Sequence, residues 1–475
     1  MTITYLCCAG QISPRVTIGT LPDNVLLDIF DFYRKAEIHD PWPWPWNRLV
    51  HVCQRWRYIV FASPLRLDLW LLCTSTTPVR KTLDVWPPLP IEIFSNSVDD
   101  DMANIIATLE HCDRVRKITF LDLTSLQWER LAPMMQEPFP ALTSLQLRTY
   151  GTAPSLPDMF FGGSAPRLQT LDLWGIPFPG LPRLLLSATD LSGLHLERIP
   201  HAGYISPEAM VTCLSTLTRL TDLVIGFQSP ASPPNRSDRR SPPLTRVILP
   251  ALEKLRFRGV SEYFEDLVAR IDAPRLCFLH ISFFHQLIFD IRQLPNFIGH
   301  TGILRSLSHA KVVIADNRID INFDPPERTL ADPLNSNLLL RIYCRAVDWQ
   351  VSSMAQIYNQ ISFLPSIVEQ LDIQVPSYLE SISQVDMDDT QWLELFRPFT
   401  TVRTLRIHHK LQSLIVPALQ ELTGERATEV FPALDNLYLR EYPPSGSDQQ
   451  AIEPFVAARQ HSDHPVAVHR WVVQR

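Results

Sequence analysis

One short pattern recurs through most of the chain and limits its fold more than any other feature. An apolar residue is followed by two variable residues, then Leu or Ile, one variable residue, and a last Leu, Ile or Phe. Ten copies stand at 115–120, 142–147, 168–173, 191–196, 220–225, 252–257, 276–281, 368–373, 402–407 and 434–439, with a weaker copy at 86–91. The first seven follow one another at intervals of 23 to 32 residues. A period of this length predicts stacked copies of one small unit rather than several unrelated domains.

Each copy predicts a β-strand, because its last two apolar positions are two residues apart and so share one face of a strand. The segments between copies are amphipathic in the helical sense. In the segment 261–271, apolar residues recur at helical spacing, and Ser206 followed by Pro207 is typical of a helix start. A strand and a helix of about 25 residues cannot bury both apolar faces alone, whereas stacked copies can. The pattern is typical of leucine-rich repeats.

We therefore predict an α/β fold with a leucine-rich-repeat solenoid over residues 73–460. Parallel strands should line its concave face, with helices or irregular segments outside. The strands are expected at 117–121, 144–148, 170–174, 193–197, 222–226, 254–258, 278–282, 370–374, 404–408 and 436–440.

Two regions interrupt the repeats, and short tails flank the domains. Residues 228–243 are rich in Pro and Ser, which predicts an exposed loop. Residues 285–345 lack the clean pattern and are expected to hold irregular or inserted repeats, including two strands around a turn at Asp316-Asn317. We expect flexible tails at 1–17 and 461–475.

Residues 18–72 form a different, helical region. Val25, Leu26, Ile29, Phe30 and Tyr33 lie at helical spacing, and a second apolar helix is expected over 46–63, ended by Pro64. The sequence PWPWPW at 41–46 predicts a loop between them. So small a unit cannot cover all this apolar surface by itself. The surface either binds a partner or packs on the first repeat, and composition alone leaves both open.

This region resembles an F-box. The F-box pattern of Leu-Pro, Val-Leu, Ile-Phe, Val-Cys, Trp-Arg, Ser-Pro and Trp stands here as Leu21, Pro22, Val25, Leu26, Ile29, Phe30, Val52, Cys53, Trp56, Arg57, Ser63, Pro64 and Trp70. With the wide gap at 41–46, it is similar to the large F-box/leucine-rich-repeat families of mushroom-forming fungi. The resemblance implies docking onto a Skp-type adaptor, and through it a cullin–RING ubiquitin ligase, while the repeats select a protein substrate. By position it implies an adaptor-binding surface made of Leu21, Pro22, Leu26, Ile29, Phe30, Val52, Cys53 and Trp56.

Composition and motifs predict a protein without catalytic chemistry. A net charge of −7 is too small for a general nucleic-acid binder, and 15 glycines leave little room for phosphate-binding loops. No nucleophile elbow, dinucleotide fingerprint or zinc-type cysteine pair occurs, and the histidines 461, 464 and 469 lie in the expected tail. We expect no enzyme activity, no cofactor, no metal, no nucleic-acid or membrane partner, and a cytoplasmic or nuclear location with reduced thiols.

The sequence also suggests where a target would bind. Side chains that alternate with the inward Leu and Ile should face the concave side, where solenoids usually bind partners. They are Lys254, Arg256, Arg258, Arg406, His408, Tyr438, Arg440 and Trp174, with Arg148 beside them. The alternative is a solvated face whose cations are balanced by Asp172, Glu197 and Asp222. For the whole protein, the alternative to a ligase adaptor is a repeat scaffold whose helical region only caps the solenoid.

Overall fold

The computed structural model describes most of the chain. It leaves residues 1–17, 37–48, 63–68, 77, 86–87, 97–100, 150, 152–154, 230–245, 304–306, 326–336, 377–388, 423, 442–446 and 473–475 undescribed. The expected tail at 1–17, the Pro/Trp stretch and nearly all of the Pro/Ser loop therefore lie outside the described residues. The chain divides into two compact units, which are residues 1–120 with 139–142 and residues 121–138 with 143–475.

The first unit holds two helices followed by alternating strands and helices. Its elements are η1 (Ile18–Thr20), α1 (Asp23–Ala36), α3 (Gln54–Ala62), β1 (Leu69–Leu72), α4 (Val79–Val85), β2 (Ile91–Asn96), α5 (Met102–Leu109) and β3 (Val115–Leu121), whose last residue belongs to the second unit. Strand β1 pairs in parallel with β2, with Leu69 opposite Ile91. Residues 69–72, which we predicted to be part of the helical region, thus belong to the sheet because their side chains alternate between buried and half-buried.

The second unit is a mixed α/β structure with a large sheet in which parallel pairing dominates, consistent with a repeat solenoid. Its strands are β4 (Ser144–Arg148), β5 (Thr170–Trp174), β6 (Gly193–Ile199), β7 (Asp222–Phe227), β9 (Lys254–Gly259), β11 (Phe278–Phe284), β12 (His309–Ala315), β13 (Arg318–Asp324), β14 (Leu338–Tyr343), β15 (Gln370–Gln374), β16 (Thr404–Ile407), β17 (Asn436–Glu441) and β18 (Ala467–Val472). They lie in the order β4-β5-β6-β7-β9-β11-β14-β13-β12-β15-β16-β17-β18. A separate parallel pair is formed by β8 (Val247–Ile248) and β10 (Ile271–Asp272).

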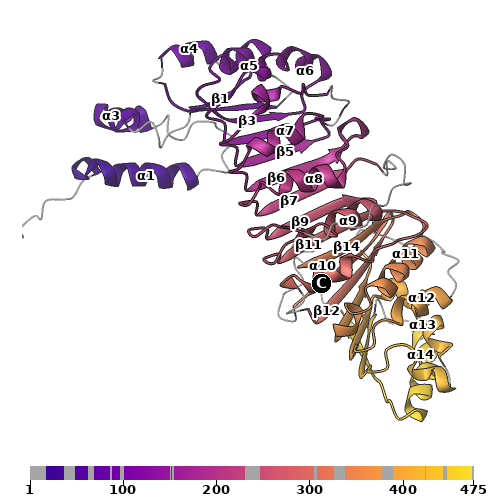
Figure 1. The fold of residues 1–475 in the computed structure, drawn as a ribbon. Coiled ribbons are helices and arrows are strands. Elements are labelled where there is room, and N and C mark those ends of the chain that lie inside the picture. The colour runs from indigo at the N-terminus through magenta and orange to yellow at the C-terminus, as the bar shows by residue number, and fades with distance from the viewer. Residues whose placement is uncertain are drawn as a thin grey trace, which may run out of the picture. The chain divides into compact units, whose positions relative to one another are not determined.

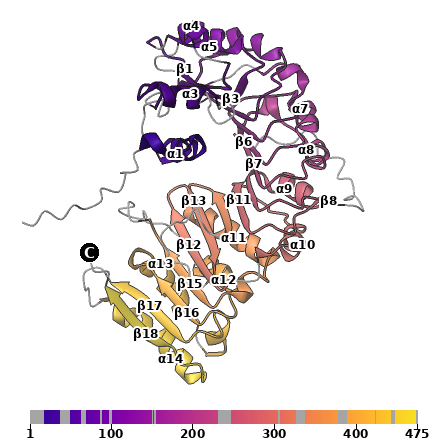
Figure 2. The same cartoon turned by 90° about the vertical axis from the view of Figure 1, so that its left-hand side faces the viewer.

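Helices of the second unit follow one face of this sheet (Figure 1 and Figure 2). They are α6 (Ser125–Leu131), α7 (Leu181–Ser187), α8 (Pro207–Leu214), α9 (Ser261–Val268), α10 (Leu294–Gly299), α11 (Val347–Gln360), α12 (Asp389–Phe396), α13 (His409–Gln420) and α14 (Ser447–His461), with short 3₁₀ turns between them. We call the face opposite the helices the open face. Helix α8 begins as predicted, since the Ser206 hydroxyl accepts a hydrogen bond from the Ala209 N–H at 3.2 Å and Pro207 is its first residue.

The repeated leucines form the core between sheet and helices. In the register of β4 to β14, one row across seven strands consists of leucine alone, and its members are 0–1% exposed: Leu145, Leu171, Leu194, Leu223, Leu255, Leu279 and Leu338. Each fully buried leucine stabilises the fold by roughly 1.5–3 kcal/mol relative to an exposed one. Parallel register places every copy's leucine against the next, so the repeat in sequence becomes a continuous core in space. Each of the ten predicted segments contains a strand.

The irregular segment 285–345 inserts a hairpin into the parallel sheet. Strands β12 and β13 pair antiparallel around Asp316-Asn317, as predicted. Strand β13 also pairs antiparallel with β14, which returns to lie parallel beside β11. After β11 the chain therefore forms β12 three places away in the sheet, and returns through β13 to β14 beside β11. Among the described strands of this sheet, β13 is the one that runs in the opposite direction.

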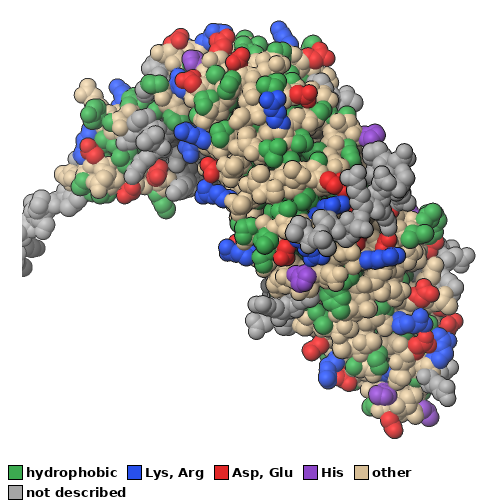
Figure 3. Space-filling model, viewed as in Figure 1, with side chains coloured by type: hydrophobic (Ala, Val, Ile, Leu, Met, Phe, Trp, Pro, Cys, Tyr) green, Lys and Arg blue, Asp and Glu red, His purple; other side chains and the backbone are tan. Residues whose placement is uncertain are grey.

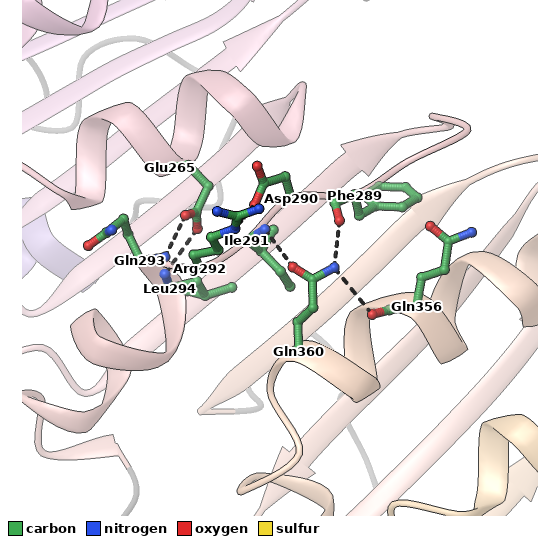
Figure 4. A network of polar contacts seen from close by, with 9 residues as sticks. All are labelled: Glu265, Phe289, Asp290, Ile291, Arg292, Gln293, Leu294, Gln356 and Gln360. Carbon is green, nitrogen blue, oxygen red and sulfur yellow. Dashed lines mark hydrogen bonds and ion pairs between the residues drawn. The ribbon is translucent and has the colours of Figure 1, made fainter. Parts of the chain in front are cut away.

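The link between β11 and β12 is tied to neighbouring helices by side chains that bond its backbone (Figure 4). On α11, the Gln360 amide oxygen accepts from the Ile291 N–H at 2.9 Å, and its nitrogen donates to the Phe289 carbonyl at 2.5 Å. On α9, the Glu265 carboxylate accepts from the N–H groups of Gln293 at 2.5 Å and Leu294 at 3.0 Å. Such bonds satisfy backbone groups that have no partner in a regular sheet.

Two expectations near the C-terminus are wrong. The expected tail at 461–475 contains β18, which pairs in parallel with β17 because the edge of β17 would otherwise carry unpaired backbone groups. The strand predicted at 404–408 ends at Ile407, and His408 is the N-cap of α13 instead. Its ring accepts a hydrogen bond from the Lys410 N–H at 3.4 Å and is 7% exposed, so it has little surface to offer a target.

Candidate interaction surfaces

Helices α1 and α3 pack as a pair with a small core of their own. Leu26 and Phe30 of α1 are 0% and 3% exposed, and Ile59 and Val60 of α3 are equally buried. The ring of Phe30 lies 4.8 Å from that of Trp56. Apolar contact between the two helices therefore holds the pair together.

Polar contacts fix the start of α1 against α3. The Arg55 guanidinium of α3 binds the Asp23 carboxylate at 2.6 Å and donates to the Leu21 carbonyl at 2.5 Å. Both side chains of the ion pair are more than a third exposed, so the pair itself contributes about 0–1 kcal/mol. Sequence reasoning gave no role to Arg55, and only its position opposite the start of α1 shows one.

The structure separates the eight residues expected to bind an adaptor into two groups. Leu26 and Phe30 are buried, and Leu21 and Trp56 are half-buried. Four remain exposed: Pro22, Ile29, Val52 and Cys53. The buried group packs the pair, and the exposed group is available to a partner.

Further exposed apolar side chains extend the second group. Val25, Ile29 and Phe32 follow one another at i, i+4 and i+7 on α1, and are 37%, 39% and 75% exposed. Val52 and Tyr58 are 59% and 72% exposed. We call these five residues the apolar surface of the helical pair. Phe32 and Tyr58 were not among the predicted residues, although Phe32 continues the helical spacing of Val25 and Ile29.

The second candidate surface is the open face of the sheet around β9. Lys254 and Arg256 are exposed and Arg258 is half-buried, all on this strand and alternating with buried Leu255 and Phe257 as predicted. Figure 3 looks onto the opposite, helix-covered side of this part of the sheet, where Lys and Arg side chains are interspersed with Asp and Glu.

Arginines on this face lie over aromatic rings of neighbouring strands. The Arg256 guanidinium carbon is 5.5 Å from the ring centre of Phe278, and that of Arg258 is 4.6 Å from Tyr343 and 5.5 Å from Phe284. Arg406 lies over Tyr438 in the same way, at 5.4 Å. A ring under the guanidinium plane holds the arginine while its in-plane N–H donors remain free to bind.

A hollow of about 310 Å³ opens on this face. It is lined by Glu197, Arg198, Val224, Ile225, Gly226, Arg256, Phe257, Arg258, His280, Ser282, Leu339, Arg341 and Tyr343. These residues come from β6, β7, β9, β11 and β14, so four arginines from three strands converge on one site.

The backbone that lines the hollow has two unusual features. Strand β6 shifts register between Leu196 and Ile199, and Arg198 within the shift has a φ of 50°, a conformation that costs a side-chain-bearing residue about 1 kcal/mol or more. Gly226 on β7 lies between Glu197 and Arg258 and has no side chain, so the space between these two residues stays open. The bulge brings Arg198 to the hollow and the glycine makes room in it.

Among the described residues, the acidic residues expected to balance the β9 cations form no ion pair with them. Asp172 forms an ion pair with Arg148 at 2.6 Å. Asp222 lies 3.5 Å from His195, and this contact raises the pKa of the imidazole. Glu197 stays in the hollow, where burial, and then the charge of Asp172, raises the pKa of its carboxyl.

The remaining residues expected to bind a target are spread along the sheet. Trp174 of β5 adjoins the hollow, because Arg198 lies over its ring at 6.0 Å. Arg406 and Tyr438 lie on β16 and β17, and β16 is six strands beyond β9, roughly 29 Å away. Arg440 is part of β17, and its side chain lies outside the described ones. Of the residues predicted to bind a target, the structure thus brings Arg256 and Arg258 together at the hollow and leaves Arg406 distant from it.

Within the described part of the chain, no group of three or more His, Cys, Asp or Glu side chains could hold a metal ion. No described helix combines the length and the apolar character needed to cross a membrane.

Comparisons with known proteins add little to this description. No protein-family model matches the chain. No curated protein matches it either. Among solved structures, a similar one is the leucine-rich repeat-containing protein LegL7 from Legionella pneumophila, at 11% identity, 82% coverage of this chain, 97% coverage of that chain and a TM-score of 0.27. With so low a TM-score we draw no functional conclusion from the likeness.

Proposed function

We propose that this chain is a non-catalytic adaptor. In this proposal, the helical pair docks a Skp-type adaptor of a cullin–RING ubiquitin ligase, and the open face of the repeat sheet binds a protein target for ubiquitination. The F-box-like order of residues from Leu21 to Trp70 motivates the first half. The arginine-rich hollow motivates the second.

The observation that carries the proposal is the apolar surface of the helical pair. The pair closes its own core through Leu26, Phe30, Ile59 and Val60, yet its five surface residues stay 37–75% exposed. Several exposed apolar side chains on a small helical unit are typical of sites where a partner binds. A helical region that served only to cap the repeats would be expected to bury such residues within its own unit, and their exposure favours a partner.

Co-purification with a Skp-type adaptor tests this function. Replacing both Ile29 and Val52 by Asp would place two charges in the proposed apolar contact, which weakens the binding free energy by several kcal/mol. The double variant Ile29→Asp/Val52→Asp should lose the adaptor while the circular dichroism of the chain stays unchanged. Leu26→Asp is a poorer probe because Leu26 is 0% exposed and a charge there would unfold the pair.

Ile248→Asp provides the matched control, because Ile248 is an apolar residue of the second unit that is 62% exposed. This variant should capture the adaptor as the unaltered chain does. Full adaptor capture by the Ile29→Asp/Val52→Asp variant would reject the assigned surface. Equal loss in both variants would reject it as well, since the loss would then not depend on the helical pair.

A further inference from the structure

We infer that the arginine hollow on the open face binds the phosphate group of a phosphorylated serine or threonine in the target segment. This inference rests on the proposed function, because the ligand is assigned to a protein target. It adds the chemical class of the group that is recognised.

The charge in the hollow matches a phosphate better than a carboxylate. The Asp320 carboxylate binds Arg341 through two hydrogen bonds of 2.6 and 2.8 Å and also accepts from Arg318 at 3.1 Å, so it offsets part of the Arg341 charge. Among the described residues, no carboxylate forms an ion pair with Arg198, Arg256 or Arg258. With Glu197 opposing them, these three cations leave a net charge near +2, whereas a phosphate monoester carries about −1.5 to −2 and a carboxylate −1.

The geometry of the arginines also favours a group with several acceptor oxygens. Arg256 rests on Phe278 and Arg258 on Tyr343, so their donor edges are held in place before a ligand arrives. One guanidinium fork satisfies both oxygens of a carboxylate. The N–H donors of two guanidinium groups, together with the Ser282 hydroxyl that also lines the hollow, match the three free acceptor oxygens of a phosphate.

The hollow is large enough to admit a phosphorylated side chain. Its volume is about 310 Å³, and apolar Val224 and Leu339 line it beside the arginines. A Cβ at Gly226 would lie 3.7 Å from the Cβ of Arg258, an ordinary contact. A longer side chain at this position would fill the hollow without removing any charge.

Binding of the full chain to an array of random nonapeptides tests the inference. Each peptide is made with a central serine, phosphoserine or glutamate. We expect some phosphoserine peptides to bind at least about tenfold more tightly than both counterparts, since a charge-assisted hydrogen-bond pair accounts for roughly a tenfold to hundredfold change in affinity. Equal binding of glutamate and phosphoserine peptides would overturn the phosphate assignment, and so would an array without phosphoserine-dependent binding.

Three variants locate the site. Arg256→Gln/Arg258→Gln should weaken phosphopeptide binding at least tenfold, and Gly226→Leu should weaken it with all charges kept. Arg219→Gln/Arg275→Gln removes the same charge from two arginines that are 70% and 67% exposed and pair with Asp190 and Glu253, and it should change binding less than twofold. An equal loss of phosphopeptide binding in this control would show general attraction between charges and would overturn the assignment of the site. Unchanged binding in the first two variants would overturn it as well.

Adaptor capture by the same preparations separates this inference from the ligase proposal. The Arg256→Gln/Arg258→Gln variant should capture the Skp-type adaptor normally, and an unchanged circular dichroism spectrum should show that its repeats are folded. If the unaltered chain binds phosphopeptides through the hollow but captures no adaptor, the ligase proposal fails and the phosphate site stands. If it captures the adaptor but binds no phosphopeptide, the phosphate site fails alone.

Discussion

The division of α1 into a packing side and a binding side can be tested by truncating one residue on each side. Leu26 is 0% exposed, so Leu26→Ala leaves a cavity within the helical pair. Such substitutions cost about 2–5 kcal/mol. Ile29 is 39% exposed, so Ile29→Ala loses only part of its burial and gains a few tenths of a kcal/mol in helix propensity. We expect a net cost below about 1 kcal/mol for the second change.

Hydrogen exchange followed by mass spectrometry reports this difference locally. A cost of about 2 kcal/mol corresponds to a roughly 30-fold loss of amide protection when a segment exchanges by opening. Leu26→Ala should therefore speed exchange in peptides from both α1 and α3, because Phe30 and Trp56 couple the two helices. Ile29→Ala should change exchange in these peptides less than about fivefold.

Peptides from β7 serve as the internal control, since this strand belongs to the second unit and stability in stacked repeats depends on nearest neighbours. Comparable loss of protection in the two variants would refute the division of α1 into two sides. So would unchanged exchange in Leu26→Ala.

Three further predictions concern the second unit. Burial raises the pKa of the Glu265 carboxyl from 4.5 to about 7. Between pH 4.5 and 7 the folded protein therefore keeps a proton that the unfolded chain has released, and the free energy of unfolding should fall as the pH rises through this range. Glu265→Gln should flatten that decline, by at most about 3 kcal/mol, in urea unfolding between pH 4.5 and 7. Gln360→Leu should speed hydrogen exchange in the segment 286–294, because it leaves the Ile291 N–H and Phe289 carbonyl without their partner, at about 1–3 kcal/mol each. Gly175→Ala should destabilise the fold by about 2 kcal/mol or more in the same urea assay, since Gly175 has a φ of 72° and its Cβ would lie 2.7 Å from the Thr149 carbonyl oxygen. Gly193→Ala, whose Cβ would make an ordinary 3.6 Å contact, is the tolerated control.

The repeat made the strands predictable because it determines which side chains are buried. In each copy the two inward apolar residues force one register, and a slip by one residue would expose both. The hairpin of β12 and β13 was also predictable from its turn. Its place in the sheet was not, because the order in which β11, β14 and β13 pair depends on contacts between distant segments. Strand β18 was missed because its sequence carries no repeat and its stability comes from pairing with β17.

The candidate surfaces show the same limit. Alternation along β9 was enough to identify Arg256 and Arg258 from the amino-acid sequence alone. Arg198 reaches the hollow only through a backbone bulge, and Arg341 only through the return of β14 to β11, neither of which a local pattern encodes. In the helical pair, the F-box-like pattern named Leu26 and Ile29 together, and only packing shows that one is buried and the other exposed.

The most direct test of the account is the footprint of a Skp-type adaptor on the full chain, measured by hydrogen exchange with and without the adaptor. Slower exchange should appear in peptides spanning α1 (Asp23–Ala36) and residues 49–62, which carry the apolar surface of the helical pair, while peptides from β9, β11 and β14 remain unchanged. Protection confined to the open face of the sheet, or no protection anywhere at adaptor concentrations that saturate an F-box protein, would contradict it.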